Sequence, residues 1–218
     1  MRLTITNYLD VISSWCFWAV PVWEELRERY GDRVDFNWKI ALMDKTGLPS
    51  TRKQMEWFYR RSGMLMRSPV MLRTNWHDED REEYPEPNCV AEAARELGVS
   101  DDCVWKALMK AELLEGKKIS EWETAAEIGA SAGGLEKDKL LERAKSPEID
   151  ARIRQSTAKF HALQVTQRPT FVIDTPIGDR AVFSGFAKAA PLAATLDAML
   201  DDLADYAAHA AHFGQPPP

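Results

Sequence analysis

The sequence predicts an α/β fold that is interrupted by a long all-helical segment. Strand-like alternation of apolar residues occurs near the N-terminus and again after residue 169, each time beside a helical pattern. Between these regions, roughly a hundred residues from Asp44 onward follow a helical period. Because a structureless excursion of that length is implausible within one domain, we expect a helical subdomain inserted into a single α/β domain.

The N-terminal segment predicts a strand, a helix and a second strand. Residues 3–8 alternate and are rich in residues that favour strands. The stretch 15–30 is apolar at helical spacing, with a kink expected at Pro21 and an end at Gly31. Residues 34–43 again predict a strand, and the connection between the strands is long enough for a parallel crossover.

The middle block predicts several helices, each with its own capping residues. Gly98 and Gly116 are typical of helix ends, whereas Ser146 followed by Pro147 is typical of a helix start. The expected helices are residues 88–97, a helix capped by Ser100 with Asp101 and Asp102 that runs to Glu115, a helix that begins with a Ser120 and Glu123 capping box, and residues 147–163.

The C-terminal segment predicts a hairpin and a final helix. Thr170 to Asp174 and Arg180 to Phe183 have strand character and are separated by turn residues. A helix rich in alanine and leucine is expected from Lys188 to His209, followed by a frayed tail.

Composition and charge argue against several classes of function. With 28 Lys and Arg against 34 Asp and Glu, the formal net charge is −6, so nucleic acid is not an expected partner. The apolar runs are far shorter than the ~20 residues of a membrane-spanning helix, so no membrane association is expected. The chain has only three cysteines, Cys16, Cys89 and Cys103, which are too few for a disulfide framework and, as an odd number, cannot all pair. The N-terminus lacks the apolar stretch of a secretory signal. We therefore expect a cytoplasmic protein.

The junction between the first strand and the first helix gathers residues that can carry chemistry. Ser13 and Cys16 are three residues apart, so both are expected on roughly one side of the first helical turn. The unsatisfied N–H groups of a helix start stabilise an anion, which would lower the pKa of a thiol held there. Each residue also has an ordinary interpretation, since Ser13 or Ser14 is typical of an N-cap and Cys16 of a buried, inert side chain.

A second feature is a proline at the very start of a predicted strand, in Arg168-Pro169-Thr170. Only edge positions or the first residue of a strand tolerate proline. A trans proline that begins the strand is the ordinary interpretation, since only about 5–6% of X–Pro bonds are cis in folded proteins.

These motifs together resemble the DsbA-like thioredoxin-fold superfamily, in the branch of FrnE-like proteins, 2-hydroxychromene-2-carboxylate isomerase and kappa-class glutathione transferase. The segment Asp10-Val11-Ile12-Ser13-Ser14-Trp15-Cys16-Phe17 is similar to a motif with Asp first, Cys or Ser fourth, and Cys or Ser again seventh. The resemblance spans nearly the full length and implies a thioredoxin-like fold with an inserted all-helical subdomain. It also implies a cis-proline loop at Pro169 and a turn at Ser184-Gly185 ahead of the last helix.

The resemblance implies a division of the chain as well. Residues 1–43 and 147–212 would form the thioredoxin-like domain, residues 44–146 the helical insertion, and residues 213–218 a flexible tail. Dimerisation is common in the family, so a homodimer is an expected assembly.

Candidate site residues follow from the same resemblance. Ser13 stands where the isomerase and transferase branch has a serine that holds the sulfur of glutathione as a thiolate, and Cys16 stands where redox members have a resolving thiol. Ser13 and Cys16 are therefore the catalytic candidates, with glutathione or another small thiol as the expected cosubstrate. The candidate binding residues are Ser14, Trp15, Lys53, Arg168, Pro169 and Gly185.

Three functions remain open from the sequence. The leading one is a glutathione-dependent isomerase or transferase for a small electrophilic, aromatic substrate, with Trp57, Trp76 and Trp105 as apolar walls. The second is thiol–disulfide chemistry in which Cys16 forms mixed disulfides, with Cys89 or Cys103 as a distant partner. The third is a binding module without catalysis. No metal site is expected.

Overall fold

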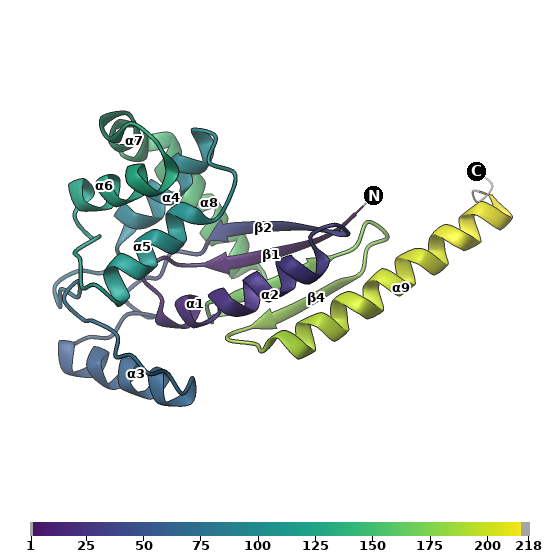
Figure 1. The fold of residues 1–218 in the computed structure, drawn as a ribbon, viewed down its shortest axis with the longest axis horizontal. Coiled ribbons are helices and arrows are strands. Elements are labelled where there is room, and N and C mark those ends of the chain that lie inside the picture. The colour runs from purple at the N-terminus through teal and green to yellow at the C-terminus, as the bar shows by residue number, and fades with distance from the viewer. Residues whose placement is uncertain (1, 215–218) are drawn as a thin grey trace.

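The computed structural model describes residues 2–214, which form a four-stranded mixed sheet with a helical block at one end (Figure 1). The strands are β1 (Leu3–Leu9), β2 (Val34–Ile40), β3 (Thr170–Asp174) and β4 (Arg180–Ser184), in the spatial order β2-β1-β3-β4. β1 pairs parallel with β2 and antiparallel with β3, and β3 pairs antiparallel with β4. The parallel crossover and the hairpin are both as predicted.

Helices account for most of the remaining described residues. They are α1 (Ser14–Trp18), α2 (Val20–Tyr30), α3 (Arg52–Leu65), α4 (Pro85–Glu96), α5 (Cys103–Leu113), α6 (Trp122–Gly133), α7 (Lys137–Ala144), α8 (Pro147–Ala162) and α9 (Ala189–Phe213). α1 and α2 replace the single kinked helix expected over residues 15–30. The break falls at Ala19, which puts Pro21 in the first turn of α2, where a missing N–H leaves no carbonyl unpaired.

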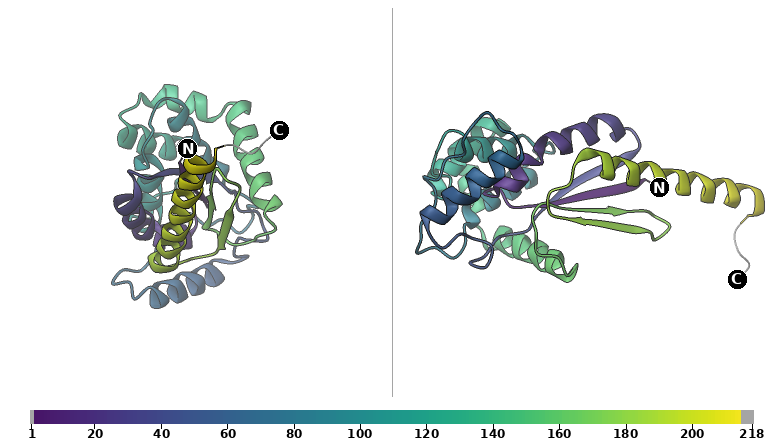
Figure 2. Two further views of the ribbon diagram at one scale, coloured as in Figure 1. Left: turned by 90° about the vertical axis from the view of Figure 1, so that its right-hand side faces the viewer. Right: turned by 90° about the horizontal axis from the view of Figure 1, so that it is seen from below.

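Helices cover both faces of the sheet. α2 and α9 lie on one face and α8 lies on the other (Figure 2). The Tyr30 hydroxyl donates to Asp197 of α9 (2.8 Å), and Ser156 of α8 donates to the carbonyl of Ile40 in β2 (2.6 Å). α4 to α7 gather beyond the carboxyl end of β1, and α3 stands at the outer edge of the molecule (Figure 1). Within residues 2–214, no helix has both the length and the apolar character needed to cross a bilayer.

Some predicted helix boundaries are confirmed and others are wrong. Ser146 caps α8 by accepting from the amide of Ile149 (3.4 Å), as predicted. The Ser120 and Glu123 capping box is absent, because α6 begins after Glu121 and the Glu123 carboxylate pairs with Lys137 (2.7 Å).

Two other predicted boundaries shift for visible reasons. β2 ends at Ile40, not Met43, because side chains take the next amides: Leu42 N–H donates to Thr157 Oγ1 (2.9 Å) and Met43 N–H to Asp10 Oδ2 (2.6 Å). α9 continues to Phe213, so the predicted tail at 213–218 begins too early, and residues 215–218 lie outside the described part of the chain.

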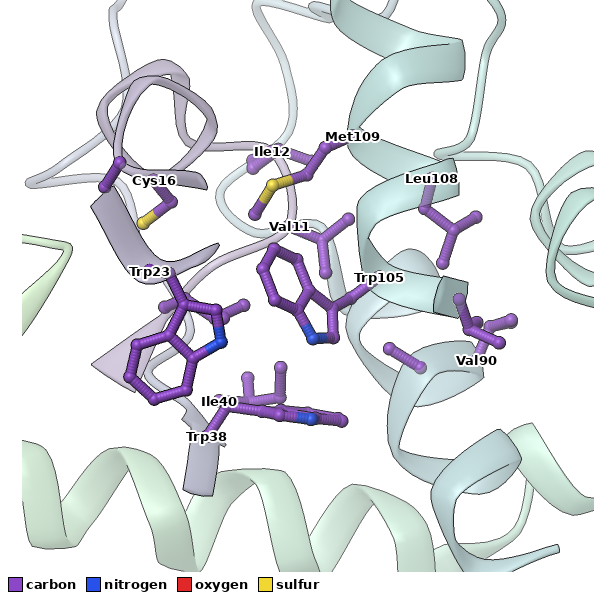
Figure 3. Packing of buried hydrophobic residues seen from close by; sticks show 14 of the residues in the cluster. Val11, Ile12, Cys16, Trp23, Trp38, Ile40, Val90, Trp105, Leu108 and Met109 are labelled. Carbon is purple, nitrogen blue, oxygen red and sulfur yellow. The ribbon is translucent and has the colours of Figure 1, made fainter. Parts of the chain in front are cut away.

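One hydrophobic cluster joins the sheet layer to the helical block. Trp23 comes from α2 and Trp105 from α5, and Figure 3 shows both rings beside Val11 and Ile40. Trp23 also donates its indole N–H to Asp102 Oδ2 at the start of α5 (2.8 Å). The helical insertion is therefore packed against the α/β layer through a shared core.

A buried carboxylate connects three chain segments at the carboxyl end of β1. Asp10 is fully buried, and its Oδ1 accepts from the amide of Ile12 (3.1 Å) and from Asn88 Nδ2 (2.9 Å), while its Oδ2 accepts from Met43. Asn88 in α4 in turn accepts from the amide of Val11 through its Oδ1 (3.1 Å). Burial nevertheless raises the pKa of Asp10, with these hydrogen bonds opposing the rise.

Replacing Asn88 therefore tests how strongly this connection supports the fold. Asn88→Ala leaves the Val11 amide and one Asp10 oxygen short of a partner, so we expect a loss of about 2–3 kcal/mol in the free energy of unfolding. Urea titration measures the loss. Asn75→Ala, at an exposed asparagine, serves as the control and should cost about 0.5 kcal/mol or less. Equal stability of the two variants would contradict this role.

Candidate active site

A cavity of about 610 Å³ opens at the carboxyl end of β1. Its walls come from the β1–α1 loop, the segment after β2, α3, and the segment before β3. This volume is in the usual range for small-molecule sites. Among the residues that line it are Ser13, Ser14, Trp15, Asp44, Phe58, Tyr59, Arg61, Trp76, His161 and Arg168.

Ser13 is the N-cap of α1 and also lines the cavity. Its Oγ accepts from the amide N–H of Cys16 (3.3 Å), so the ordinary capping interpretation is confirmed. A hydroxyl that accepts one hydrogen bond keeps its own proton free for donation. Capping and binding are therefore compatible, because the oxygen orders the helix start while the O–H can turn either to the adjacent Cys16 sulfur or to a ligand.

Two backbone donors lie beside this hydroxyl. The amide N–H groups of Ser14 and Trp15 occupy the first turn of α1, and among residues 2–214 neither has a protein acceptor. Such unpaired first-turn amides are the groups that bind anions at a helix start. Trp15 is held in place by its ring contact with Phe186, whose centroid lies 6.0 Å away.

Arg168 is buried enough that desolvation lowers its pKa, yet its guanidinium is well satisfied. Nε donates to the carbonyl of Ala41 (2.6 Å), Nη2 to that of Leu42 (2.7 Å) and Nη1 to that of Thr166 (3.3 Å). These contacts hold the segment after β2 against the segment before β3. Because a guanidinium has five N–H donors, two remain for a ligand.

The proline loop lies next to Arg168. The Arg168–Pro169 peptide bond is cis, as the resemblance to the thioredoxin superfamily implied. Gly185 donates its amide N–H to the Pro169 carbonyl (2.9 Å) and has φ +92°, a conformation that favours glycine. Pro169 and Gly185 are joined by this hydrogen bond, and neither is among the residues that line the cavity.

Cys16 lies in the core, away from the cavity lining. Its side chain is 3% exposed and points among buried apolar residues, as Figure 3 shows. Burial raises the pKa of the Cys16 thiol to about 12, so the lowered pKa expected from the helix start is wrong. The five-residue α1 offers few aligned dipoles, and the loss of hydration outweighs them. Cys89 and Cys103 are also free thiols, so neither is bonded to Cys16.

Other sequence candidates are dispersed. Lys53 is exposed on α3 and borders a separate shallow hollow with Trp57, while Trp105 is in the core and Trp76 alone of the predicted walls lines the cavity. Sequence reasoning missed Arg61 and His161 as lining residues, and nothing in their local sequence distinguishes them. No cluster of three or more potential metal ligands occurs within the described residues.

Comparison with models of protein families identifies the family to which the chain belongs. A model described as a DSBA-like thioredoxin domain matches residues 4–197, most of the chain. The chain belongs to the DsbA-like thioredoxin family. Comparison with curated protein sequences gives no significant match.

Solved structures show which DsbA-like proteins share this fold. The putative protein disulfide isomerase from Nitrosomonas europaea has 17% identity and a TM-score of 0.73, covering 93% of this chain and 99% of its own. The cytosolic disulfide reductase DsbM from Pseudomonas aeruginosa has 20% identity and a TM-score of 0.72, with 91% and 98% covered. 2-Hydroxychromene-2-carboxylate isomerase has 14% identity and a TM-score of 0.65, with 93% and 98% covered.

A buried acid lies behind the cavity wall of this DsbA-like chain. Glu112 in α5 is fully buried, and neither carboxylate oxygen has a hydrogen-bond partner within residues 2–214. Burial, together with the charge of Asp10, raises the pKa of Glu112 well above its ordinary value. Burial, and after it the charge of Glu112, raises the pKa of Tyr59, whose hydroxyl accepts from Trp76 Nε1 (3.0 Å).

Glu112 should therefore make stability depend on pH. Its folded-state pKa lies above the unfolded value of about 4.3, so the native chain binds more protons between those values and the free energy of unfolding falls as pH rises. As the pH rises from about 5 to about 8, the free energy of unfolding should therefore fall less for Glu112→Gln than for wild type. Urea titrations at several pH values measure this. Parallel curves for wild type and Glu112→Gln would contradict the assignment, and Glu142→Gln, at an exposed site, is the control.

The position of Cys16 makes a second prediction. Because its thiol is buried with a pKa of about 12, iodoacetamide should modify Cys16 at least about 100-fold more slowly in the native protein than in urea. Peptide mass spectrometry follows each cysteine separately, and half-buried Cys103 is the internal comparison. Fast native alkylation with an apparent pKa near or below the ordinary thiol value would show that Cys16 reaches solvent.

Proposed function

We propose that this DsbA-like protein is a glutathione-dependent isomerase or transferase that acts on a small, electrophilic aromatic substrate. The observation that carries the proposal is that Ser13 lines the cavity whereas Cys16, although its thiol lies within hydrogen-bond reach of the Ser13 side chain, does not. The cavity contains a serine hydroxyl and two unpaired amides, whereas the protein's own thiol lies in the core with a raised pKa. A thiol that reacts in this cavity therefore has to come from a bound cosubstrate.

The fold neighbours support thiol chemistry of this kind. They include DsbM, named as a cytosolic disulfide reductase and also solved with GSH, and 2-hydroxychromene-2-carboxylate isomerase. The name of DsbM and the three free cysteines of this chain support a cytoplasmic location. Disulfide exchange through Cys16 is the weaker alternative, because the thiol would first have to leave the core.

The thiolate and one carboxylate of glutathione would be held by hydrogen-bond donors that line the cavity. Its sulfur would lie at the Ser13 hydroxyl and the amides of Ser14 and Trp15, which together favour the thiolate over the thiol. One of its carboxylates would receive the two remaining N–H donors of Arg168. Main-chain groups beside Pro169 would bind its peptide portion.

The remaining walls suit an aromatic substrate. Met55, Phe58 and Trp76 give the cavity apolar surface, and the Tyr59 hydroxyl, which accepts from Trp76, keeps its own proton for donation to a substrate oxygen. The thiolate would add to an electron-poor double bond, forming a C–S bond as the π electrons move to the substrate's carbonyl oxygen. Expulsion of the thiolate after bond rotation gives isomerisation, whereas protonation of the adduct gives transfer.

Glutathione binding and the ionisation of its thiol test the proposal directly. Calorimetry should detect binding at or below about millimolar glutathione, and thiolate absorbance should report a bound thiol with a pKa below the value of about 8.5 in water. Ser13→Ala should return that pKa toward its value in water, by about one unit or more, because the O–H donor is lost. Cys16→Ala is the control and should leave the bound pKa unchanged.

Either of two outcomes would reject this function. Absence of heat at millimolar glutathione removes the cosubstrate. Glutathione binding with the same bound-thiol pKa in wild type and Ser13→Ala would instead indicate a binding module whose serine acts only as a helix cap.

A further inference from the structure

The outer surface of α3 and the loop after it is basic and apolar at once. We define the α3 surface as the exposed side chains of residues 52–73. Six of them are basic, and none of the six forms an ion pair within residues 2–214: Arg52, Lys53, Arg60, Arg61, Arg67 and Arg73. Five are large and apolar, with exposed fractions from 46% to 74%: Trp57, Met64, Leu65, Val70 and Met71.

The positive charge of this segment opposes that of the remaining chain. Residues 52–73 contain these six basic residues and a single acidic residue, Glu56, whereas the remaining chain has 22 Lys and Arg against 33 Asp and Glu. In the part of the chain that the structure describes, the only other arginine without a carboxylate partner is Arg168 of the cavity. An anionic surface would therefore attract the α3 surface and repel most of the molecule, which would orient the protein as it approaches.

Basic and apolar side chains share one face of α3. Trp57, Arg60, Arg61, Met64 and Leu65 follow the helical spacing i, i+3, i+4, i+7 and i+8, which places them along one side of the helix. All five are exposed. Of the nine large apolar side chains that are exposed within residues 2–214, five belong to the α3 surface. Apolar side chains gathered in this way, beside unpaired charges, are typical of a surface that binds a partner.

The opposite face of α3 holds the helix on the body of the protein. Met55 and Tyr59 are buried there, and Ser62 Oγ accepts from the indole N–H of Trp18 in α1 (3.1 Å). α3 stands at the outer edge of the molecule (Figure 1). The inner face thus fixes the helix, and its outer face is left to a partner outside the chain.

We propose that the α3 surface docks on the surface of an anionic phospholipid membrane. The basic side chains would lie among the headgroup phosphates, and the apolar side chains would enter the boundary between headgroups and acyl chains. Tryptophan favours that boundary, and arginine can bury its carbon stem there while its charge stays among the headgroups. Docking of this kind needs no helix that spans the bilayer.

The shape of the α3 surface fits a bilayer better than a soluble acidic protein. Tight protein interfaces are centred on pockets that a few large side chains of the partner fill. The hollow that borders this surface, at Lys53 and Trp57, is shallow, and its lining includes neither Met64, Leu65 nor Met71. Exposed apolar side chains without a pocket match a fluid bilayer, which adapts its own shape to them.

The cavity and the α3 surface meet at Arg61, which belongs to both. A docked membrane would therefore lie beside the rim of the cavity. In a consequence that rests on the proposed function, a small aromatic substrate dissolved in the lipid would be concentrated next to the site where it reacts. Docking itself requires neither glutathione nor substrate, so the two proposals succeed or fail separately.

Co-sedimentation of the full chain with lipid vesicles tests the docking. In about 50 mM salt, the protein should bind vesicles of phosphatidylcholine with about 30% phosphatidylglycerol at least about tenfold more tightly than vesicles of phosphatidylcholine alone. Binding should weaken about tenfold or more in about 500 mM salt, because salt screens the headgroup charge. No glutathione is present in this assay.

Two pairs of substitutions on the α3 surface separate the two contributions. Arg60→Glu/Arg67→Glu should weaken binding to the anionic vesicles about 30-fold or more, because two attractive charges are replaced by two repulsive ones. Met64→Ser/Leu65→Ser should weaken it about tenfold, because less apolar surface enters the lipid. All four side chains are exposed, so the variants should fold as wild type does, which circular dichroism checks.

Matched changes elsewhere on the molecule serve as controls. Lys139→Glu/Lys159→Glu reverses two exposed charges on α7 and α8. Tyr206→Ser/Phe213→Ser removes two apolar side chains from α9 that are 63% and 69% exposed, against 74% and 66% for Met64 and Leu65. Both control variants should bind the anionic vesicles as wild type does.

Fluorescence quenching by lipids brominated on their acyl chains shows whether the apolar side chains enter the bilayer. Trp57 is the only one of the eight tryptophans that is exposed, and all eight lie within residues 2–214. Bound wild type should therefore be quenched. Trp57→Phe should still bind and should lose most of the quenching.

Four results would overturn the proposal. The first is no binding to the anionic vesicles in low salt. The second is binding that Arg60→Glu/Arg67→Glu and Lys139→Glu/Lys159→Glu weaken equally. The third is binding without quenching of Trp57, which would indicate attraction to any soluble or fixed polyanion. The fourth is association of the wild-type protein without vesicles that Arg60→Glu/Arg67→Glu abolishes, which would assign the α3 surface to a second copy of the chain.

Discussion

The buried Asp10 carboxylate is the interaction on which the site depends. It accepts from the β1–α1 loop at Ile12, from the segment after β2 at Met43 and from α4 at Asn88. Those contacts fix two walls of the cavity and attach the helical insertion to the sheet. A buried carboxylate is stable only when its oxygens are hydrogen bonded, so the three segments are constrained together and cannot shift separately without leaving a polar group unpaired.

Because of that constraint, the serine and the cysteine of the Ser-x-x-Cys motif have different chemical roles. With the β1–α1 loop fixed, Ser13 faces the cavity as the N-cap, and Cys16 enters the core. Both residues are buried, but of the two only Ser13 lines the cavity. Loss of hydration dominates at Cys16 and raises its pKa, whereas the hydroxyl and free amides at the cavity suit a sulfur anion supplied from outside. The helical block contributes Tyr59 and Trp76 to the same cavity.

Local patterns in the sequence predicted the strands, the hairpin and the Ser146 cap, because those features depend on neighbouring residues. The resemblance also predicted that Ser13, Ser14, Trp15 and Arg168 would be site residues, and the structure places all four in one cavity. What could not be predicted depends on contacts distant in the chain. Asn88 donates a hydrogen bond to Asp10, which lies 78 positions away in the sequence. Glu123 forms an ion pair with Lys137 instead of a capping box. The burial of Cys16 depends on residues that pack from α2 and α5. Lys53 was predicted as a binding residue as well, but on α3 it borders a different hollow.

The central claim is that the reactive sulfur in this cavity comes from a bound thiol held by Ser13. A crystal structure of the protein soaked with reduced glutathione tests it most directly. The account predicts glutathione sulfur within hydrogen-bond distance of Ser13 Oγ, with Cys16 unmodified in the core. Density for a mixed disulfide between glutathione and Cys16, or glutathione bound away from Ser13, would contradict it.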